Sequence, residues 1–107
     1  MIEAVYNRKY NRLTVKGHAY SGEPGHDLVC SAASMLAYTL AVNVAGLSDK
    51  GQATEPMIKL EPGDTEISCK PRARSKSTVA LVFNSVCVGF EVLAHDYPEN
   101  ISYEVRG

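Results

Sequence analysis

The chain has 107 residues, which is enough for one domain with a modest core and too few for two. Its hydrophobic share of 45% argues against wholesale disorder, and its formal net charge of −1 predicts no general attraction to nucleic acid or to anionic membranes. Three cysteines, an odd number at wide spacing, do not form a disulfide framework and indicate a reducing compartment. We therefore expect one cytoplasmic domain over residues 1–107.

The chain begins with two short runs rich in β-branched residues, 2–6 and 13–18. A polar stretch separates them, so they predict an antiparallel pair of strands. Residues 20–25 contain two glycines and a proline, which excludes a regular element. This loop is interpreted either as a plain connection or as a lid over a site.

A long uncharged stretch from Leu28 to about Ala45 predicts a helix, with Gly46 as its stop. Its apolar residues cover a broad face, which predicts burial on more than one side and hence a dimer interface. They are Leu28, Val29, Ala32, Leu36, Leu40 and Val44, widened by Ala33, Met35, Tyr38 and Val42. The uncharged run from Leu28 to Leu47 also reaches the length of a membrane span, but its polar residues and alanines favour a buried helix, and no membrane contact is expected.

The second half of the chain predicts a hairpin and another helix. A Glu-Pro-Gly-Asp turn signal lies between the runs 57–60 and 65–69. Alternation of apolar and polar residues places Cys69 on the inward face as a small core residue. An apolar stripe within 75–95 predicts the second helix, in which Cys87 also serves for packing. The stripe consists of Val79, Val82, Phe83, Val86, Phe90 and Leu93.

A last strand is expected over 101–105, after Tyr97-Pro98 ends the second helix. The predicted order is therefore β-β-α-β-β-α-β. Two long helices on one face of a small, mostly antiparallel sheet form a two-layer α+β domain.

His18 closes the second predicted strand, and Cys30 lies near the start of the first predicted helix. A thiol in the first turn of a helix feels the positive end of the helix dipole and free backbone N–H groups, which favour the thiolate. A histidine nearby would complete a nucleophile–base pair, and the same N–H groups could form an oxyanion hole. The pair therefore indicates cysteine chemistry.

Two neighbouring polar residues have two interpretations each. Asp27 either caps the first helix or orients His18 as a third catalytic member, and capping is the preferred interpretation. Ser34 lies one turn beyond Cys30, so its hydroxyl points either toward the site or back to the helix backbone.

A metal site and a basic patch are the remaining alternatives. His18, His26 and Cys30 could supply three ligands, but the spacing matches no recognised zinc motif, and no metal or cofactor is expected. The segment 70–76 carries four positive charges and could touch RNA or an acidic substrate. A solvated connection is the preferred interpretation, and no direct nucleic-acid binding is expected.

The candidate residues belong to a motif of fixed spacing. It consists of Gly17-His18-Ala19, a loop, and then Gly25, Asp27, Leu28, Val29, Cys30, Ala32 and Ser34. This motif resembles that of the ribosomal-processing cysteine protease family (Prp-type), and the resemblance extends over nearly the whole chain. It implies a cysteine endopeptidase with Cys30 as nucleophile and His18 as base, and a loop whose Gly22 and Gly25 help form the substrate pocket.

The resemblance also implies a cytoplasmic homodimer. Its substrate would be the N-terminal extension of large-subunit ribosomal protein number twenty-seven, cut after an aromatic residue. Prophage relatives process capsid or scaffold proteins, so a prophage-associated protease is one alternative. A non-catalytic, ribosome-associated binding module is the other.

Overall fold

The computed structural model describes residues 1–18 and 26–107, with the backbone only for residues 26 and 27. Five strands and two helices follow one another with a short 3-10 turn before the second helix. They are β1 (Ile2–Asn7), β2 (Arg12–Lys16), α1 (His26–Asp49), β3 (Ala53–Glu61), β4 (Asp64–Pro71), the turn Ala73–Ser75, α2 (Lys76–Asp96) and β5 (Ile101–Arg106).

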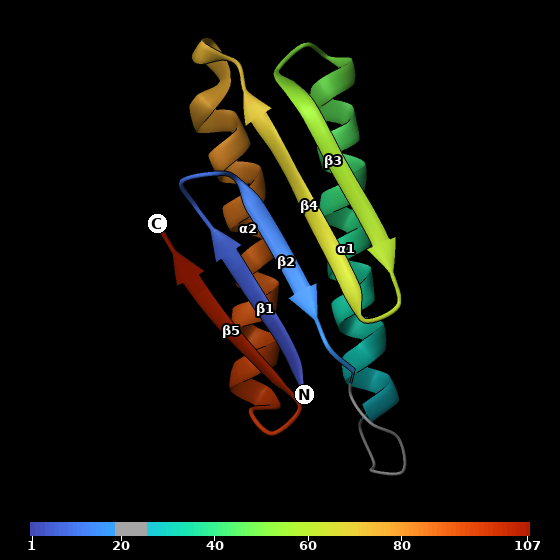
Figure 1. Ribbon diagram of the computed structural model, residues 1–107. Coiled ribbons are helices and arrows are strands. Elements are labelled where there is room, and N and C mark those ends of the chain that lie inside the picture. Colours follow the sequence, from blue (N-terminus) through green and yellow to red (C-terminus); the bar gives the residue numbers. More distant parts are fainter. Residues whose placement is uncertain (19–25) are drawn as a thin grey trace.

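The strands form one sheet in the order β3-β4-β2-β1-β5. All neighbours are antiparallel except β1 and β5, which run parallel. Both helices cover the same face of the sheet, and the other face is open (Figure 1). The predicted two-layer α+β fold and its element order are confirmed.

The core lies between the helices and the covered face. In β1, Ile2, Ala4 and Tyr6 alternate with more exposed neighbours, as a strand with one buried face requires. Tyr6 stacks on Phe83 of α2 with 5.9 Å between ring centroids. The predicted stripe of α2 is confirmed, with four members buried and two partly buried against the core: Val79, Phe83, Phe90 and Leu93, then Val82 and Val86.

The two helices approach each other closely at Gly89 of α2. A Cβ at this position would lie only 2.5 Å and 3.0 Å from the two methyl carbons of Leu36 on α1. A side chain at this position would therefore require Leu36 to change its conformation, and glycine lets the two helices pack without that change.

The first helix differs from its prediction at both ends. It begins at His26 and not at Leu28, so Asp27 lies in the first turn; the predicted capping contact of its side chain falls outside the described residues. The helix also passes through Gly46 and ends at Asp49, because the chain reverses two residues further on, where Gly51 has a φ of +71°. A glycine that adopts helical angles costs a helix only about 1 kcal/mol, which the packing of α1 outweighs.

The β3–β4 hairpin is longer than predicted. The predicted run began at Met57, whereas β3 starts at Ala53 and passes Pro56 through an irregularity in register between Thr54 and Met57. Glu55 adopts a φ of +52° within this irregularity. A bulge on an edge strand accommodates a proline because no neighbouring strand needs its missing N–H.

The outer sides of both helices carry exposed apolar residues. On α1, Met35 and Val42 are 67% and 70% exposed, and on α2 Leu81 is 66% exposed. Both helices are long and apolar enough to cross a membrane by length and composition, a criterion that core helices of soluble proteins also meet. Of the broad apolar face predicted for α1, only one side is therefore covered in the single chain.

Candidate active site

One cavity of about 360 Å³ contains both candidate catalytic residues. It is bounded by α1, by the end of β2 and by the β3–β4 turn. Its polar lining includes His18, Cys30 and Ser34, and the rest is mainly apolar: Ile2, Val15, Gly17, Ala33, Ala37, Tyr38, Leu60, Glu61, Pro62, Gly63 and Thr65. The fold therefore brings together two residues whose proximity the sequence could only suggest.

Cys30 is the fifth residue of α1, two residues further into the helix than predicted. Its side chain is partly buried against the core and reaches the cavity. The N–H groups that lack a partner within a helix belong to its first turn, which here precedes Cys30. Donors for a developing negative charge therefore lie at the helix end next to the thiol.

His18 lies just beyond the end of β2, with an exposed side chain. Its backbone carbonyl accepts a hydrogen bond of 3.1 Å from the ammonium group of Met1. The preceding N–H, that of Gly17, donates to the carbonyl of Gly63 at 3.0 Å. The histidine is thus tied by the backbone to the start of β1 and to the β3–β4 turn.

Gly63 forms the surface against which the His18 ring packs. A Cβ at Gly63 would overlap the imidazole, lying 2.5 Å from Cε1 and 3.1 Å from Cδ2. Gly63 also has a φ of +71°, which side chains disfavour. Only glycine satisfies both conditions, so the turn fixes how close the imidazole can come.

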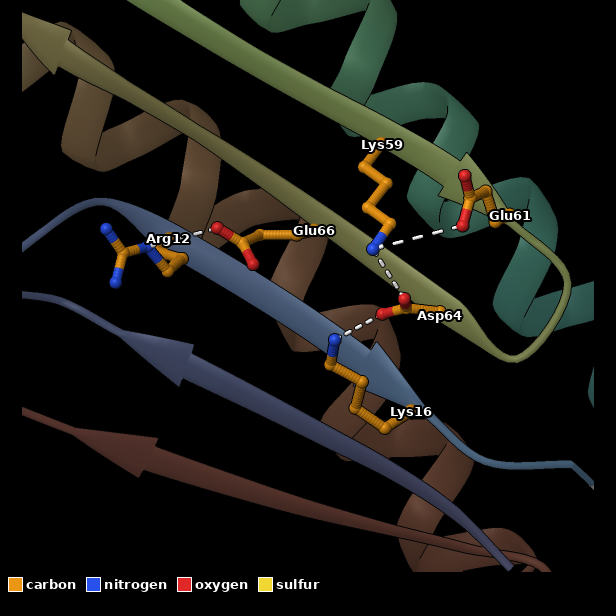
Figure 2. A network of polar contacts seen from close by, with 6 residues as sticks. All are labelled: Arg12, Lys16, Lys59, Glu61, Asp64 and Glu66. Atoms are coloured by element: carbon orange, nitrogen blue, oxygen red, sulfur yellow. Dashed lines mark hydrogen bonds and ion pairs between the residues drawn. The ribbon is translucent and has the colours of Figure 1, made fainter.

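A network of charged side chains holds this turn on the open face of the sheet (Figure 2). The Asp64 carboxylate accepts hydrogen bonds from Lys16 of β2 and, at 2.6 Å, from Lys59 of β3. These two hydrogen bonds lower the pKa of the Asp64 carboxyl to about 2. Because Lys16 ends β2 two residues before His18, the network joins the turn to the strand that immediately precedes the histidine.

The other two cysteines lie in the core, as predicted. Cys69 and Cys87 are 5% and 1% exposed. Burial raises the pKa of both thiols, that of Cys87 to about 12. A thiol kept protonated is a poor nucleophile. Of the three cysteines, only Cys30 lines the cavity.

The remaining predicted site residues have different outcomes. Ser34 lines the cavity, and no hydrogen bond from it to the helix backbone is found among the described residues. The side chains of Asp27 and His26 lie outside the described residues, as do Gly22 and Gly25 with the whole proposed lid. Where the structure describes side chains, no group of three or more His, Cys, Asp or Glu could hold a metal ion.

Sequence reasoning missed Tyr38 and the turn residues of the cavity wall. Tyr38 is two turns beyond Cys30 on the same side of α1, so the spacing of four from Cys30 to Ser34 to Tyr38 was an available signal. The contribution of Pro62 and Gly63 depends on the pairing of β2 with β4, which the local sequence does not encode.

Comparison with known proteins identifies the family of the chain. Residues 1–102 match the family described as cysteine protease Prp. The ribosomal processing cysteine protease Prp of Mycoplasma pneumoniae is 28% identical over 97 residues, covering 89% of this chain and 87% of that protein. The Staphylococcus aureus (strain Mu50) protein of the same name is 25% identical over 93 residues, covering 87% of this chain and 84% of that protein.

The fold also has a close match among solved structures. It is a crystal structure of an essential ribosomal processing protease Prp from S. aureus in complex with a covalently linked product peptide. The TM-score is 0.76 at 23% identity, and the match covers 99% of this chain and 100% of that chain. At this level of identity the comparison shows a shared fold.

Proposed function

Because this chain belongs to the cysteine protease Prp family and is therefore a hydrolase, we propose that it cuts peptide bonds through a Cys30 nucleophile and a His18 base. The observation that carries this proposal is the shared cavity, which both side chains line. The two other cysteines are buried and cannot meet a substrate without unfolding.

The reaction has two steps. His18 takes the proton from the Cys30 thiol, and the thiolate attacks the carbonyl carbon of the scissile bond. N–H groups in the first turn of α1 stabilise the oxyanion, and the leaving amine departs with the proton that His18 returns. Water, deprotonated by His18, then hydrolyses the thioester and regenerates the thiol.

The proposed substrate is the N-terminal extension of a large-subunit ribosomal protein, cut after an aromatic residue. The family resemblance suggests it, and the relatives in Mycoplasma pneumoniae and S. aureus are named ribosomal processing proteases. The cavity supports an aromatic residue before the cut, because alanines at 33 and 37 leave room beside an aromatic wall at Tyr38.

The proposed assembly is a homodimer, acting in the cytoplasm, where thiols stay reduced. Leu28, Met35 and Val42 recur every seven residues on the outer side of α1, and Leu81 and Val88 do so on α2. A second copy would cover these apolar stripes. We expect Val42→Lys to convert a dimer to a monomer in light scattering, and a monomeric wild-type chain would contradict the dimer.

The deciding experiment is mass spectrometry of a synthetic peptide that carries the extension of the ribosomal protein from the same organism. Wild type and Cys30→Ala are compared, together with a peptide whose aromatic residue before the cut is replaced by alanine. One cut, seen only with wild type and only in the aromatic peptide, is expected. No cut with rapid alkylation of Cys30 would contradict the ribosomal substrate and favour a prophage capsid or scaffold protein. No cut and no alkylation would contradict the dyad itself and favour a binding module.

A further inference from the structure

Two basic segments meet at the end of the sheet that is remote from the cavity. Seven of the eleven lysines and arginines lie in them, three within residues 8–12 and four within 70–76. The segments join because β2 pairs with β4: Arg12 lies opposite Ser68, whereas Lys16 at the cavity end lies opposite Asp64. The β1–β2 turn and the start of α2 both lie toward the end of the molecule that is away from the β3–β4 turn (Figure 1).

A groove of about 820 Å³ lies where the two segments meet. Its lining shares no residue with the cavity that holds Cys30. Five cations and one carboxylate line it: Arg8, Lys9, Arg12, Lys70, Lys76 and Glu55. The charge of the chain is therefore unevenly distributed: the net charge is close to zero, but this groove is strongly positive.

The cations of this groove are poorly neutralised. Arg12 faces Glu66 at 3.7 Å, and Lys70 faces Glu55 at 3.9 Å. Within the described part of the chain, no carboxylate pairs with the other three groove cations, which are Arg8, Lys9 and Lys76. By contrast, Lys16 and Lys59 at the other end both pair with Asp64. Like charges that converge without counterions attract a polyanion.

An exposed aromatic ring lies among these cations. Tyr10 is 54% exposed, and Lys9 Nζ and Arg12 Cζ each lie 5.6 Å from its ring centroid. Proteins that bind single-stranded nucleic acid combine basic grooves with aromatic rings on which bases stack. An acidic peptide would use the same cations but would not need the ring.

We propose that this groove binds single-stranded RNA, with its cations on the phosphates and Tyr10 against a base. The expectation of no nucleic-acid binding rested on net charge, which averages over the two ends of the molecule. The inference is independent of the proposed protease activity, because the groove and the cavity share no residue.

The test is fluorescence anisotropy with a labelled oligouridylate of twelve nucleotides at low salt. The variant Arg8→Gln/Lys76→Gln is compared with Lys16→Gln/Lys59→Gln, which removes the same charge at the other end. We expect the groove variant to weaken binding at least tenfold and to reduce the salt slope by about 1.4, since each phosphate contact contributes roughly 0.7 for single strands. The control should change affinity less than threefold, and the groove variant should still cleave peptide.

Tyr10 distinguishes RNA from other polyanions. Tyr10→Ala should weaken binding about tenfold, and Tyr10→Phe should keep the affinity because the ring remains. No binding at about 100 μM protein, or equal losses in the two charge variants, would overturn the proposal. Equal competition by polyglutamate together with an unchanged affinity of Tyr10→Ala would also overturn it, in favour of an acidic peptide.

Discussion

The two helices each carry a cysteine, and the two thiols lie in opposite surroundings. Cys30 on α1 is half-buried and lines a cavity with His18. Cys87 on α2 is 1% exposed, and burial raises the pKa of its thiol to about 12. A thiol becomes useful for catalysis where a helix end, a strand end and a turn converge, and inert where helix and sheet close over it. Access to a cavity, rather than residue type, separates the two.

The largest expected effect tests this contrast directly. Cys30→Ala should lower kcat/KM for peptide cleavage by at least about 10³-fold, because the nucleophile is lost. Cys87→Ala should leave kcat/KM within a factor of about two while lowering the free energy of unfolding by about 1 kcal/mol. Cleavage assays and urea denaturation of both variants check this. An active Cys30→Ala would remove the distinction between the two thiols.

Removing the proposed base, His18, should have the next largest effect on activity. His18→Gln should lower kcat/KM by about 10²-fold or more at neutral pH, because the thiol loses its proton acceptor. Iodoacetamide should alkylate Cys30 more slowly in this variant, and Cys87 should stay unreacted until the protein unfolds. Alkylation of Cys30 at the wild-type rate would contradict the pairing.

Gly63 sharpens the comparison because the chain offers a matched control. Gly63 and Gly51 have the same φ of +71°, but a Cβ at Gly51 would meet nothing within 4 Å. Both alanine variants carry the same backbone strain, so a difference between them reports the contact with His18. We expect Gly63→Ala to lower kcat about tenfold and Gly51→Ala to leave it unchanged, since small misplacements of a catalytic group are costly.

The region around Cys87 should respond to alkaline pH. Burial raises the pKa of Cys87 to about 12 and also raises that of Tyr103, so the folded state holds protons that the unfolded chain releases from about pH 9 upward. Stability should therefore be complete below pH 9 and fall as pH rises toward 12. Cys87→Ala should reduce this slope in chemical denaturation, and an unchanged slope would assign the effect to Tyr103 alone.

The smallest effect concerns the Asp64 turn. The pKa of the Asp64 carboxyl is lowered to about 2. The contribution of the ionised carboxylate to the stability of the fold is therefore complete above pH 4 and is lost as pH falls toward 2. Asp64→Asn should remove that part of the acid dependence and change stability at neutral pH only slightly, because the pairs are exposed. Thermal melts between pH 2 and 6 measure both.

The order of elements was predictable because apolar residues recur at different spacings in helices and in strands. The same spacings predicted that Cys69 and Cys87 lie in the core. The roles of His18 and Cys30 were suggested by their positions at element ends. The packing of Gly63 on His18 and the meeting of the two basic segments were not predictable, since both depend on the pairing of β2 with β4. The ends of the first helix were misjudged because it starts two residues before Leu28 and continues past the local stop signal at Gly46.

The contact between Gly89 and Leu36 has a mechanical consequence. Leu36 stands between Ala33 and Ala37, which form part of the cavity wall. A side chain at position 89 would first displace the methyl groups of Leu36, on the helix that carries this wall. Position 89 therefore contacts, through one leucine, the helix segment that lines the cavity, although it does not line the cavity itself.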